Sequence, residues 1–359
     1  MREMFPVAYS QLPLSNCIRR HSATVMMILS PAACLAQWAP QTSRISAELR
    51  GLSPVDSKVV WASGARGTVL RTVDAGAHWQ VDTVPDATSL DLRAIRGLSS
   101  RSAVAMAAGN AEQGQARIFL TSDAGAHWTL QFSTDVRGVF FDALAFWDAT
   151  HGIAVSDPVD GRFYIITTED GGHSWTRVPP EQLPPTLPGE AAFAASGTCL
   201  TVQGTRNVWI ATGGGAEARV FHSGDGGKSW TVASTPARAG NASSGLFSVA
   251  FRDARHGIAV GGDYRQPTKA LDNVVLTSDG GSTWTASPGP VPAGYMSAVT
   301  FVPGTSGEAV AVGLAGTAIS TNDGRSWRMV DTTAYNSVAF SARDAGWTVG
   351  PGGRIARWR

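Results

Sequence analysis

A short segment that ends in tryptophan recurs six times along the 359-residue chain, and it constrains the fold more than any other feature. Successive copies are 49, 47, 55, 54 and 43 residues apart. A period of this length is typical of repeat architectures such as β-propellers. The tryptophans that end the copies are Trp79, Trp128, Trp175, Trp230, Trp284 and Trp327.

Each repeat contains short apolar segments separated by Gly, Asp or Pro, such as LFSVAF (246–251) and NVVLTS (273–278). Segments of this length and composition predict four β-strands per repeat. The strand of the HGIAV type occurs seven times, so we expect seven units. The last unit ends at Arg359 without an outer strand, and segment 42–51 is expected to supply that strand and close the ring. The sequence therefore predicts an all-β fold, a single seven-bladed propeller over 37–359 with four-stranded antiparallel blades.

The aspartate of the repeated segment follows one strand and precedes glycine, as in TEDGGHSW (168–175). This pattern predicts a tight turn in which the carboxylate accepts backbone N–H bonds and Gly adopts a positive φ. Copies spread around a ring cannot converge on one substrate, so we expect a structural role. One copy has Asn in place of Asp, and Asn can form the same turn without the charge. The turn residues are Asp74, Asp123, Asp170, Asp225, Asp279 and Asn322.

The pattern S/T-x-D-x-G-x-x-W resembles the Asp-box, also called the bacterial neuraminidase repeat. Together with the interleaved GIAVG strands, it makes nearly the whole chain after residue 36 resemble the photosystem II stability/assembly factor-like family, in its secreted bacterial branch. The resemblance implies a non-enzymatic binding, assembly or stability factor. The same box occurs in sialidases and xyloglucanases, so a glycoside hydrolase is the alternative function.

The N-terminal 36 residues have the pattern of a secretory signal peptide. Arg19 and Arg20 precede an apolar run over 23–36 that is too short to span a bilayer as a helix. Cleavage is expected after Ala36, with lipoprotein processing at Cys34 as the alternative. We therefore expect an exported protein, periplasmic or extracellular, with no membrane span and with Cys199 as a buried, unpaired cysteine.

Charge and motif content exclude several functional classes. Lys and Arg number 29 against 28 Asp and Glu, so no overall charge favours nucleic acid. The seven histidines show no metal-ligand spacing, and no cofactor motif is present, so we expect no metal and no cofactor. The expected partner is a protein or a glycan, bound by a monomeric chain.

Known glycosidase signatures match poorly. The segment Arg44-Ile45-Ser46 lacks the proline of the early sialidase signature, and no tyrosine lies in a recognisable nucleophile motif. Xyloglucanases with these repeats clamp two propellers face to face, whereas this chain predicts one.

Long loops lie on the face opposite the repeated turns, between the second and third strands of blades 2, 3 and 5 and in the crossovers into blades 4 and 5. We expect a polar binding rim there, with Arg162 and Arg265 binding anions and Asp157, Asp160 and Asp263 accepting sugars or cations. For the hydrolase alternative, Asp157 or Asp160 is expected to lie about 5–9.5 Å from Asp263. The predicted rim residues are Asp157, Asp160, Arg162, Glu190, Asn241, Asp263, Tyr264, Arg265 and Lys269.

Overall fold

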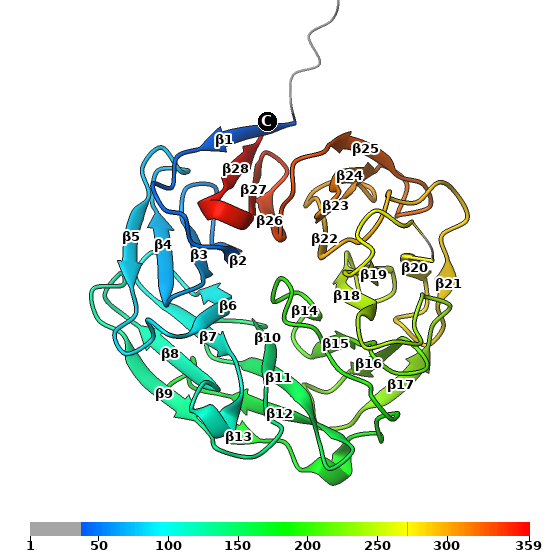
Figure 1. Cartoon of the computed structure of the whole chain (residues 1–359), viewed down its shortest axis with the longest axis horizontal. Helices are drawn as coiled ribbons and strands as arrows, with labels where there is room; N and C mark the ends of the chain where they lie inside the picture. Colours follow the sequence, from blue (N-terminus) through cyan, green and yellow to red (C-terminus); the bar gives the residue numbers. More distant parts are fainter. Residues whose placement is uncertain (1–36, 271) are drawn as a thin grey trace, which may run out of the picture. The chain divides into compact units, whose positions relative to one another are not determined.

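The computed structural model describes residues 37–270 and 272–359, which form seven four-stranded antiparallel sheets arranged as blades around a ring (Figure 1). This confirms the predicted all-β, seven-bladed propeller. The predicted signal peptide, residues 1–36, lies outside the described residues. No helix in the described part of the chain has the length and apolar character needed to cross a membrane.

Within each of blades 1 to 6 the strands follow chain order from the centre of the ring outward. Blade 1 contains β2 Leu49–Pro54, β3 Val60–Gly64, β4 Thr68–Thr72 and β5 Gln80–Thr83; blade 2, β6 Asp91–Gly97, β7 Ala103–Ala108, β8 Arg117–Thr121 and β9 Thr129–Ser133; blade 3, β10 Phe141–Phe146, β11 Gly152–Val159, β12 Arg162–Thr168 and β13 Thr176–Arg177. Blade 4 contains β14 Leu200–Gln203, β15 Asn207–Ala211, β16 Arg219–Ser223 and β17 Thr231–Ser234; blade 5, β18 Ser244–Phe251, β19 Gly257–Asp263, β20 Val274–Thr277 and β21 Thr285–Ala286; blade 6, β22 Ala298–Phe301, β23 Ala309–Gly313, β24 Gly316–Ser320 and β25 Arg328–Asp331. Blade 7 contains β26 Ser337–Ala342, β27 Ala345–Val349, β28 Ile355–Trp358 and β1 Trp38–Gln41.

The N-terminal strand β1 closes the ring by pairing with β28, in the register Trp38↔Trp358 (Figure 1). The prediction that an N-terminal strand closes the ring is confirmed. The prediction that segment 42–51 provides this strand is wrong. The positive φ of Arg44, 61°, interrupts extended backbone between the two strands, and residues from Leu49 begin β2 instead. Trp38 carries the apolar surface that holds the closing strand in place, since it is 2% exposed.

Apolar side chains of neighbouring blades pack together in the wedge between them. Between blades 3 and 4, Ile153 and Phe163 belong to the same buried cluster as Ile210 and Phe221. The rings of Phe163 and Phe221 lie 5.0 Å apart, edge to face. Trp230 belongs to this cluster too, so the tryptophan of the repeated segment in blade 4 seals the wedge against blade 3.

Each repeated segment forms a turn between the third and fourth strands of its blade; we call these segments the repeat turns. In blade 3, Asp170 accepts hydrogen bonds from the Ser174 N–H (2.9 Å) and the Ser174 hydroxyl (2.6 Å). The Thr168 hydroxyl also donates to Asp170, at 2.8 Å. These bonds, led by that of the Ser174 hydroxyl, lower the pKa of Asp170 to about 2. Gly171 and Gly172 have φ of 75° and 90°, values that an L side chain rarely adopts.

Replacing Asp170 with alanine is expected to lower the free energy of unfolding by about 1–2 kcal/mol, because the N–H and hydroxyl donors of the turn lose their acceptor. Asp170→Asn is the matched control. In blade 6, Asn322 accepts the Ser326 N–H at 3.0 Å and donates to the Ser326 hydroxyl at 2.9 Å, so Asn preserves the turn. Urea unfolding at pH 7 measures both variants. If Asp170→Ala and Asp170→Asn lost equal amounts of unfolding free energy, the stability of the turn would not depend on these hydrogen bonds.

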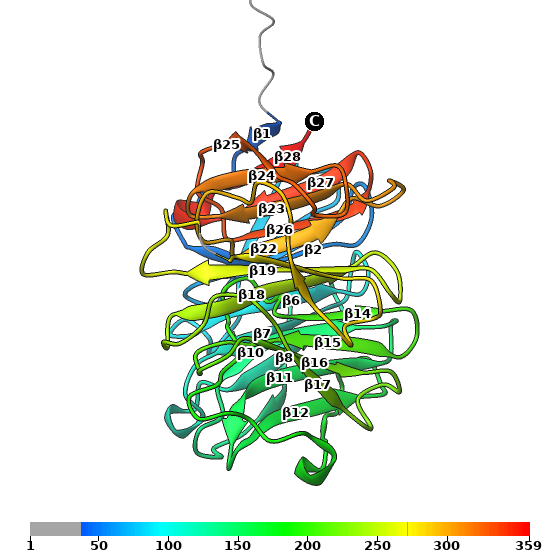
Figure 2. The ribbon, with the colours of Figure 1, turned by 90° about the vertical axis from the view of Figure 1, so that its right-hand side faces the viewer.

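The connecting loops lie on the two faces of the ring, at opposite ends of the strands (Figure 2). The repeat turns share one face with the loops between first and second strands, as the bond from Gly171 N–H to the Thr150 carbonyl shows (2.8 Å). We call it the turn face. The second-to-third loops and the crossovers between blades form the other side, the loop face, where Thr186 N–H bonds the Gly161 carbonyl at 3.0 Å.

Candidate functional site at the loop face of the channel

A β-bulge recurs near the start of the innermost strand in four blades. The pairing register shifts after Leu49, Leu92, Phe141 and Leu246, each time by one residue of the inner strand. A bulge changes the direction of the side chain that it inserts and often lies next to a functional site. The inserted residues, all of which line one cavity, are Arg50, Arg93, Asp142 and Phe247.

This cavity, which we call the loop-face cavity, has a volume of about 360 Å³. The cavity lies at the loop-face end of the central channel, which is the space enclosed by the inner strands of the ring. It is placed there because the inner-strand residues that line it come from the starts of β2, β6, β10 and β18. Its remaining wall comes from the loops and crossovers of that face. The other lining residues are Phe140, Asp157, Ala192, Phe193, Ala194, Ala195, Tyr264, Tyr295, Leu314 and Asn336.

The crossover into blade 4 ends in a segment, residues 193–199, that occupies the middle of the ring; we call it the channel segment. Arg50 Nη1 of blade 1 donates to the Ala195 carbonyl at 2.8 Å. The Ser196 hydroxyl donates to the Ser297 carbonyl, beside blade 6, at 2.8 Å. In blade 5, Val249 N–H bonds the Thr198 carbonyl at 3.0 Å. Partners on several sides of the ring place this segment across the channel (Figure 1), where it separates the loop-face cavity from the turn face.

Two aspartates form the acidic side of the loop-face cavity. Asp142 is 1% exposed, and its Oδ2 has no hydrogen-bond partner among the described residues. Burial, together with the nearby charge of Asp157, raises the pKa of Asp142 well above its usual range. Burial also raises the pKa of Asp157 to about 7, although Asp157 Oδ1 accepts the Ala192 N–H at 3.1 Å. The pair therefore retains a proton into the neutral range.

The two arginines of the cavity are each paired with a carboxylate. Arg93 Nε donates to Asp91 at 2.7 Å, and Arg50 Nη2 donates to Glu48 at 2.6 Å. Both also donate to carbonyls of the channel segment, Arg93 to Ala194 at 3.3 Å. Part of their charge is thus used to hold the channel segment in place.

An aromatic wall faces these charged groups. The rings of Phe193 and Phe247 are stacked at 3.9 Å, and Tyr295 meets Phe247 edge to face at 4.8 Å. Tyr264, also edge to face with Phe247, is 41% exposed, so it lies where the cavity opens to solvent. The cavity can therefore contact an apolar group and hydrogen-bond a polar one at the same time.

The structure separates the predicted rim residues into two groups. Asp157 and Tyr264 line the loop-face cavity. Asp263 instead accepts hydrogen bonds from the Ser243 hydroxyl (2.7 Å) and from Arg265 N–H (3.0 Å), which close its own loop. Asn241 belongs to the same turn, since it accepts the Ser243 N–H at 2.8 Å.

Glu190 is 4% exposed and forms an ion pair with Arg219, which is 9% exposed. The Thr212 hydroxyl and Leu187 N–H complete its hydrogen bonds, at 2.6 and 2.9 Å. Glu190 is therefore occupied in anchoring the crossover. The remaining predicted residues, outside the cavity lining, are Asp160 in the β11–β12 turn, Arg162 at the start of β12, and Arg265 and Lys269 in the blade 5 loop.

The predicted site residues do not include Arg50, Arg93, Asp142 and Phe247, although these four occupy equivalent positions of the repeat. They are the second residues of LRGL (49–52), LRAI (92–95), FDAL (141–144) and LFSV (246–249). An alignment of inner strands would have shown large or charged residues recurring at a position next to the channel.

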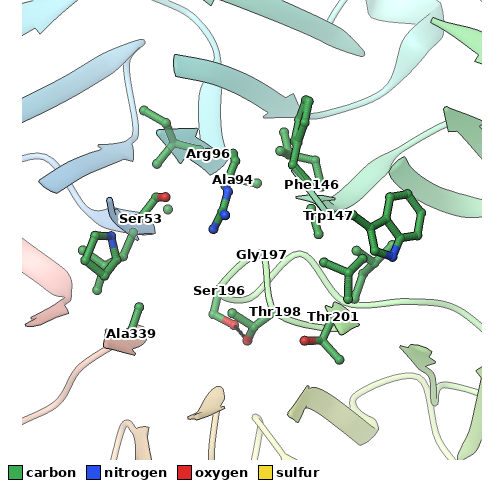
Figure 3. Close-up of a pocket in the computed structure, with 18 of the residues that line it drawn as sticks. Ser53, Ala94, Arg96, Phe146, Trp147, Ser196, Gly197, Thr198, Thr201 and Ala339 are labelled. Carbon is green, nitrogen blue, oxygen red and sulfur yellow. Dashed lines mark hydrogen bonds between the residues drawn. The ribbon is translucent and has the colours of Figure 1, made fainter. Parts of the chain in front are cut away.

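A second cavity, of about 480 Å³, lies on the other side of the channel segment, at the turn face (Figure 3). We call it the turn-face cavity. Ser196, Gly197 and Thr198 line it from the channel segment, and Ser53, Arg96 and Trp147 line it from the inner strands of blades 1 to 3 or the loop that follows. Among the described residues no cluster of three or more His, Cys, Asp or Glu side chains could hold a metal ion.

No protein-family profile and no curated protein sequence matches this chain. Its fold is similar to that of YCF48 from Cyanidioschyzon merolae, at 15% identity and a TM-score of 0.64, over 90% of this chain and 99% of that one. It is also similar to YCF48 bound to a D1 peptide, at 14% identity and a TM-score of 0.62, over 90% and 96%. A GH74 xyloglucanase from Xanthomonas campestris matches at 17% identity and a TM-score of 0.59, over 89% of this chain and 53% of the enzyme.

Proposed function

We propose that this chain is an exported, non-enzymatic propeller that binds a protein partner by receiving a peptide segment in the loop-face cavity. The observation that carries the proposal is the composition of that cavity, whose lining brings the buried carboxyl group of Asp142 together with the rings of Phe247 and Tyr264. Such a site accepts an apolar side chain against the rings and a hydrogen-bond donor against the carboxyl group.

Two further observations support a peptide ligand. The channel segment blocks the way through the ring, so the cavity is a closed-ended pocket of a size suited to one or two side chains. A similar propeller, YCF48, has been solved with a D1 peptide bound.

The N-terminal apolar run over 23–36 supports export to the periplasm or the cell exterior.

Leu314→Arg tests the proposal without disturbing the core. Leu314 lines the loop-face cavity and is 42% exposed, so an arginine there obstructs the opening but leaves packing intact. We expect at least a tenfold loss of partner capture in a crosslinking experiment with a photoreactive residue at Tyr264. Val73→Arg is the matched control, because Val73 is 49% exposed and lies in a repeat turn on the other face.

Equal capture by the two arginine variants would reject the loop-face cavity as the binding site. Arg162→Ala combined with Arg265→Ala tests the outer rim separately, since neither residue lines the cavity. Unchanged capture by this double variant, together with loss in Leu314→Arg, places recognition in the cavity and not in the rim.

The Asp142 and Asp157 pair favours a second candidate function, glycoside hydrolysis. Two neighbouring carboxyl groups, of which one keeps its proton near neutral pH, provide an acid and a base. This pair replaces the predicted pairing with Asp263, which is occupied by its own loop. Release of 4-nitrophenol from aryl glycosides, abolished by Asp142→Asn and by Asp157→Asn, would favour this function over the first.

A further inference from the structure

The turn-face cavity has one charged group, the guanidinium of Arg96, among all its lining residues. The other lining residues are apolar, small, or neutral polar. Figure 3 shows Arg96 directed from β6 toward the middle of the cavity, above the channel segment. A positive charge therefore stands at this mouth of the channel without a negative lining residue to balance it.

Arg96 differs from Arg50 and Arg93 in having no partner among the residues that the structure describes. Arg50 and Arg93 pair with Glu48 and Asp91, respectively. Within residues 37–270 and 272–359, by contrast, the Arg96 side chain makes no hydrogen bond and no ion pair. Water still reaches it through the mouth, while the surrounding walls remove part of its solvation and so lower its pKa from the usual value. A guanidinium in this situation gains free energy when an anion enters.

The groups around Arg96 favour a carboxylate. A guanidinium and a carboxylate are both planar and join through two parallel N–H to O bonds. The side chains of Thr201 and Gln203 line the same cavity and make no other hydrogen bond in the described part of the chain, so they are available to a ligand. The indole of Trp147 is fixed by its bond to the Asn207 carbonyl, at 2.8 Å, and provides an apolar wall.

We infer that the turn-face cavity is a binding site for a carboxylate group, held by Arg96. The carboxylate belongs either to a small organic acid or to an acidic side chain of a peptide, and about 480 Å³ is enough for either. The site is independent of the proposed peptide site, because the channel segment lies between the two cavities.

Protection of Arg96 from an arginine reagent tests the site directly. The protein is treated with phenylglyoxal, and the modification of each arginine is followed by peptide mass mapping. We expect glutarate, or the peptide acetyl-Glu-Glu-Glu-amide, to slow modification of Arg96 at least fivefold relative to sodium chloride at equal ionic strength. Arg343, exposed in the β26–β27 turn of the turn face and outside the cavity lining, is the internal control.

Equal slowing at Arg96 and Arg343, or none at either, would overturn the inference. Protection by glutarate alone identifies a small acid as the ligand, and protection by the peptide identifies an acidic side chain.

A second experiment measures the affinity of the protein for glutarate by NMR line broadening. We expect at least a tenfold loss in Arg96→Gln, a smaller loss in Arg96→Lys, which keeps the charge but not the paired bonds, and no loss in Leu314→Arg.

Thermal unfolding checks that Arg96→Gln is folded. A folded Arg96→Gln protein with unchanged glutarate affinity would also overturn the inference. If Leu314→Arg loses partner capture but retains its affinity for glutarate, the two cavities bind their ligands independently. The carboxylate site and the proposed function can then each be rejected without the other.

Discussion

Trp38→Ala is expected to lower the free energy of unfolding by about 3–5 kcal/mol, the range for removing a large buried aromatic side chain. The indole of Trp38 lies 5.0 Å from that of Trp358 and 6.1 Å from the ring of Tyr335. Its Nε1 donates to the Thr317 hydroxyl, in blade 6, at 3.0 Å. The residue thus joins blade 7 to blade 6 from the closing strand. Urea unfolding followed by tryptophan fluorescence measures the loss.

The same variant is expected to open the ring locally. Without Trp38, the four-residue strand β1 keeps few apolar contacts, so amide hydrogens of β28 should exchange faster while those of blade 3 do not. Trp38→Phe is the control, because it keeps most of the apolar area and loses only the bond to Thr317. Unchanged exchange in β28 would show that pairing alone, and not the tryptophan, holds the ring closed.

The fold was predictable because its information is repeated. Each copy of the turn fixes two strands, so errors in one repeat are corrected by the others. The closing strand, by contrast, was assigned to the wrong segment because it lies outside the repeats. Strand β1 carries no copy of the turn, and only Trp38, buried against Trp358 at the far end of the chain, identifies its position.

The site was less predictable because two kinds of contact are invisible in the sequence. Asp142 lies in FDALAF, which is an ordinary buried strand until a bulge turns one side chain toward the channel. Glu190 lies in a long polar loop, yet it pairs with Arg219, which is 29 residues away along the chain. Loop length predicted a site on the loop face, and that remains a prediction, whereas the roles of individual charges depend on partners brought together by the ring.

The channel segment gives the two mouths of the channel different chemistry. At the loop face it meets Arg50, Arg93 and the aspartate pair, so positive and negative groups share one cavity. At the turn face it lines a cavity whose one charged lining residue is Arg96. A crossover of ordinary composition therefore divides one channel into two cavities that suit different ligands.

Asp157→Asn is expected to change how stability depends on pH. The folded chain holds the Asp157 proton up to about pH 7, against an ordinary pKa of 3.8. Between these values the folded state binds more protons at Asp157 than the unfolded state, so the contribution of Asp157 to stability is greatest in acid and is lost as the pH rises from about 4 to about 7. Asparagine removes this loss. At pH 8 the variant should be more stable than the wild type by up to about 4 kcal/mol, because each pKa unit corresponds to about 1.4 kcal/mol.

At pH 4 the two proteins should differ little, because Asp157 is then protonated in the folded chain and its amide replacement is of similar shape. Urea unfolding at several pH values between 4 and 8 measures the difference. Asp142→Asn should act in the same direction, and the double variant should gain less than the sum, because the two carboxyl groups share their titration.

Asp170→Asn is the control for this experiment. Hydrogen bonds lower the pKa of Asp170 to about 2, so its contribution to stability is lost only as the pH falls below about 4. The slope between pH 4 and 8 should therefore match that of the wild type. If Asp157→Asn also kept the wild-type slope, Asp157 would be ionised throughout this range and would present its negative charge to any ligand. A ligand that brings an ammonium group should bind the wild type more tightly as the pH rises through 7, because ionisation of the pair then supplies its counter-charge.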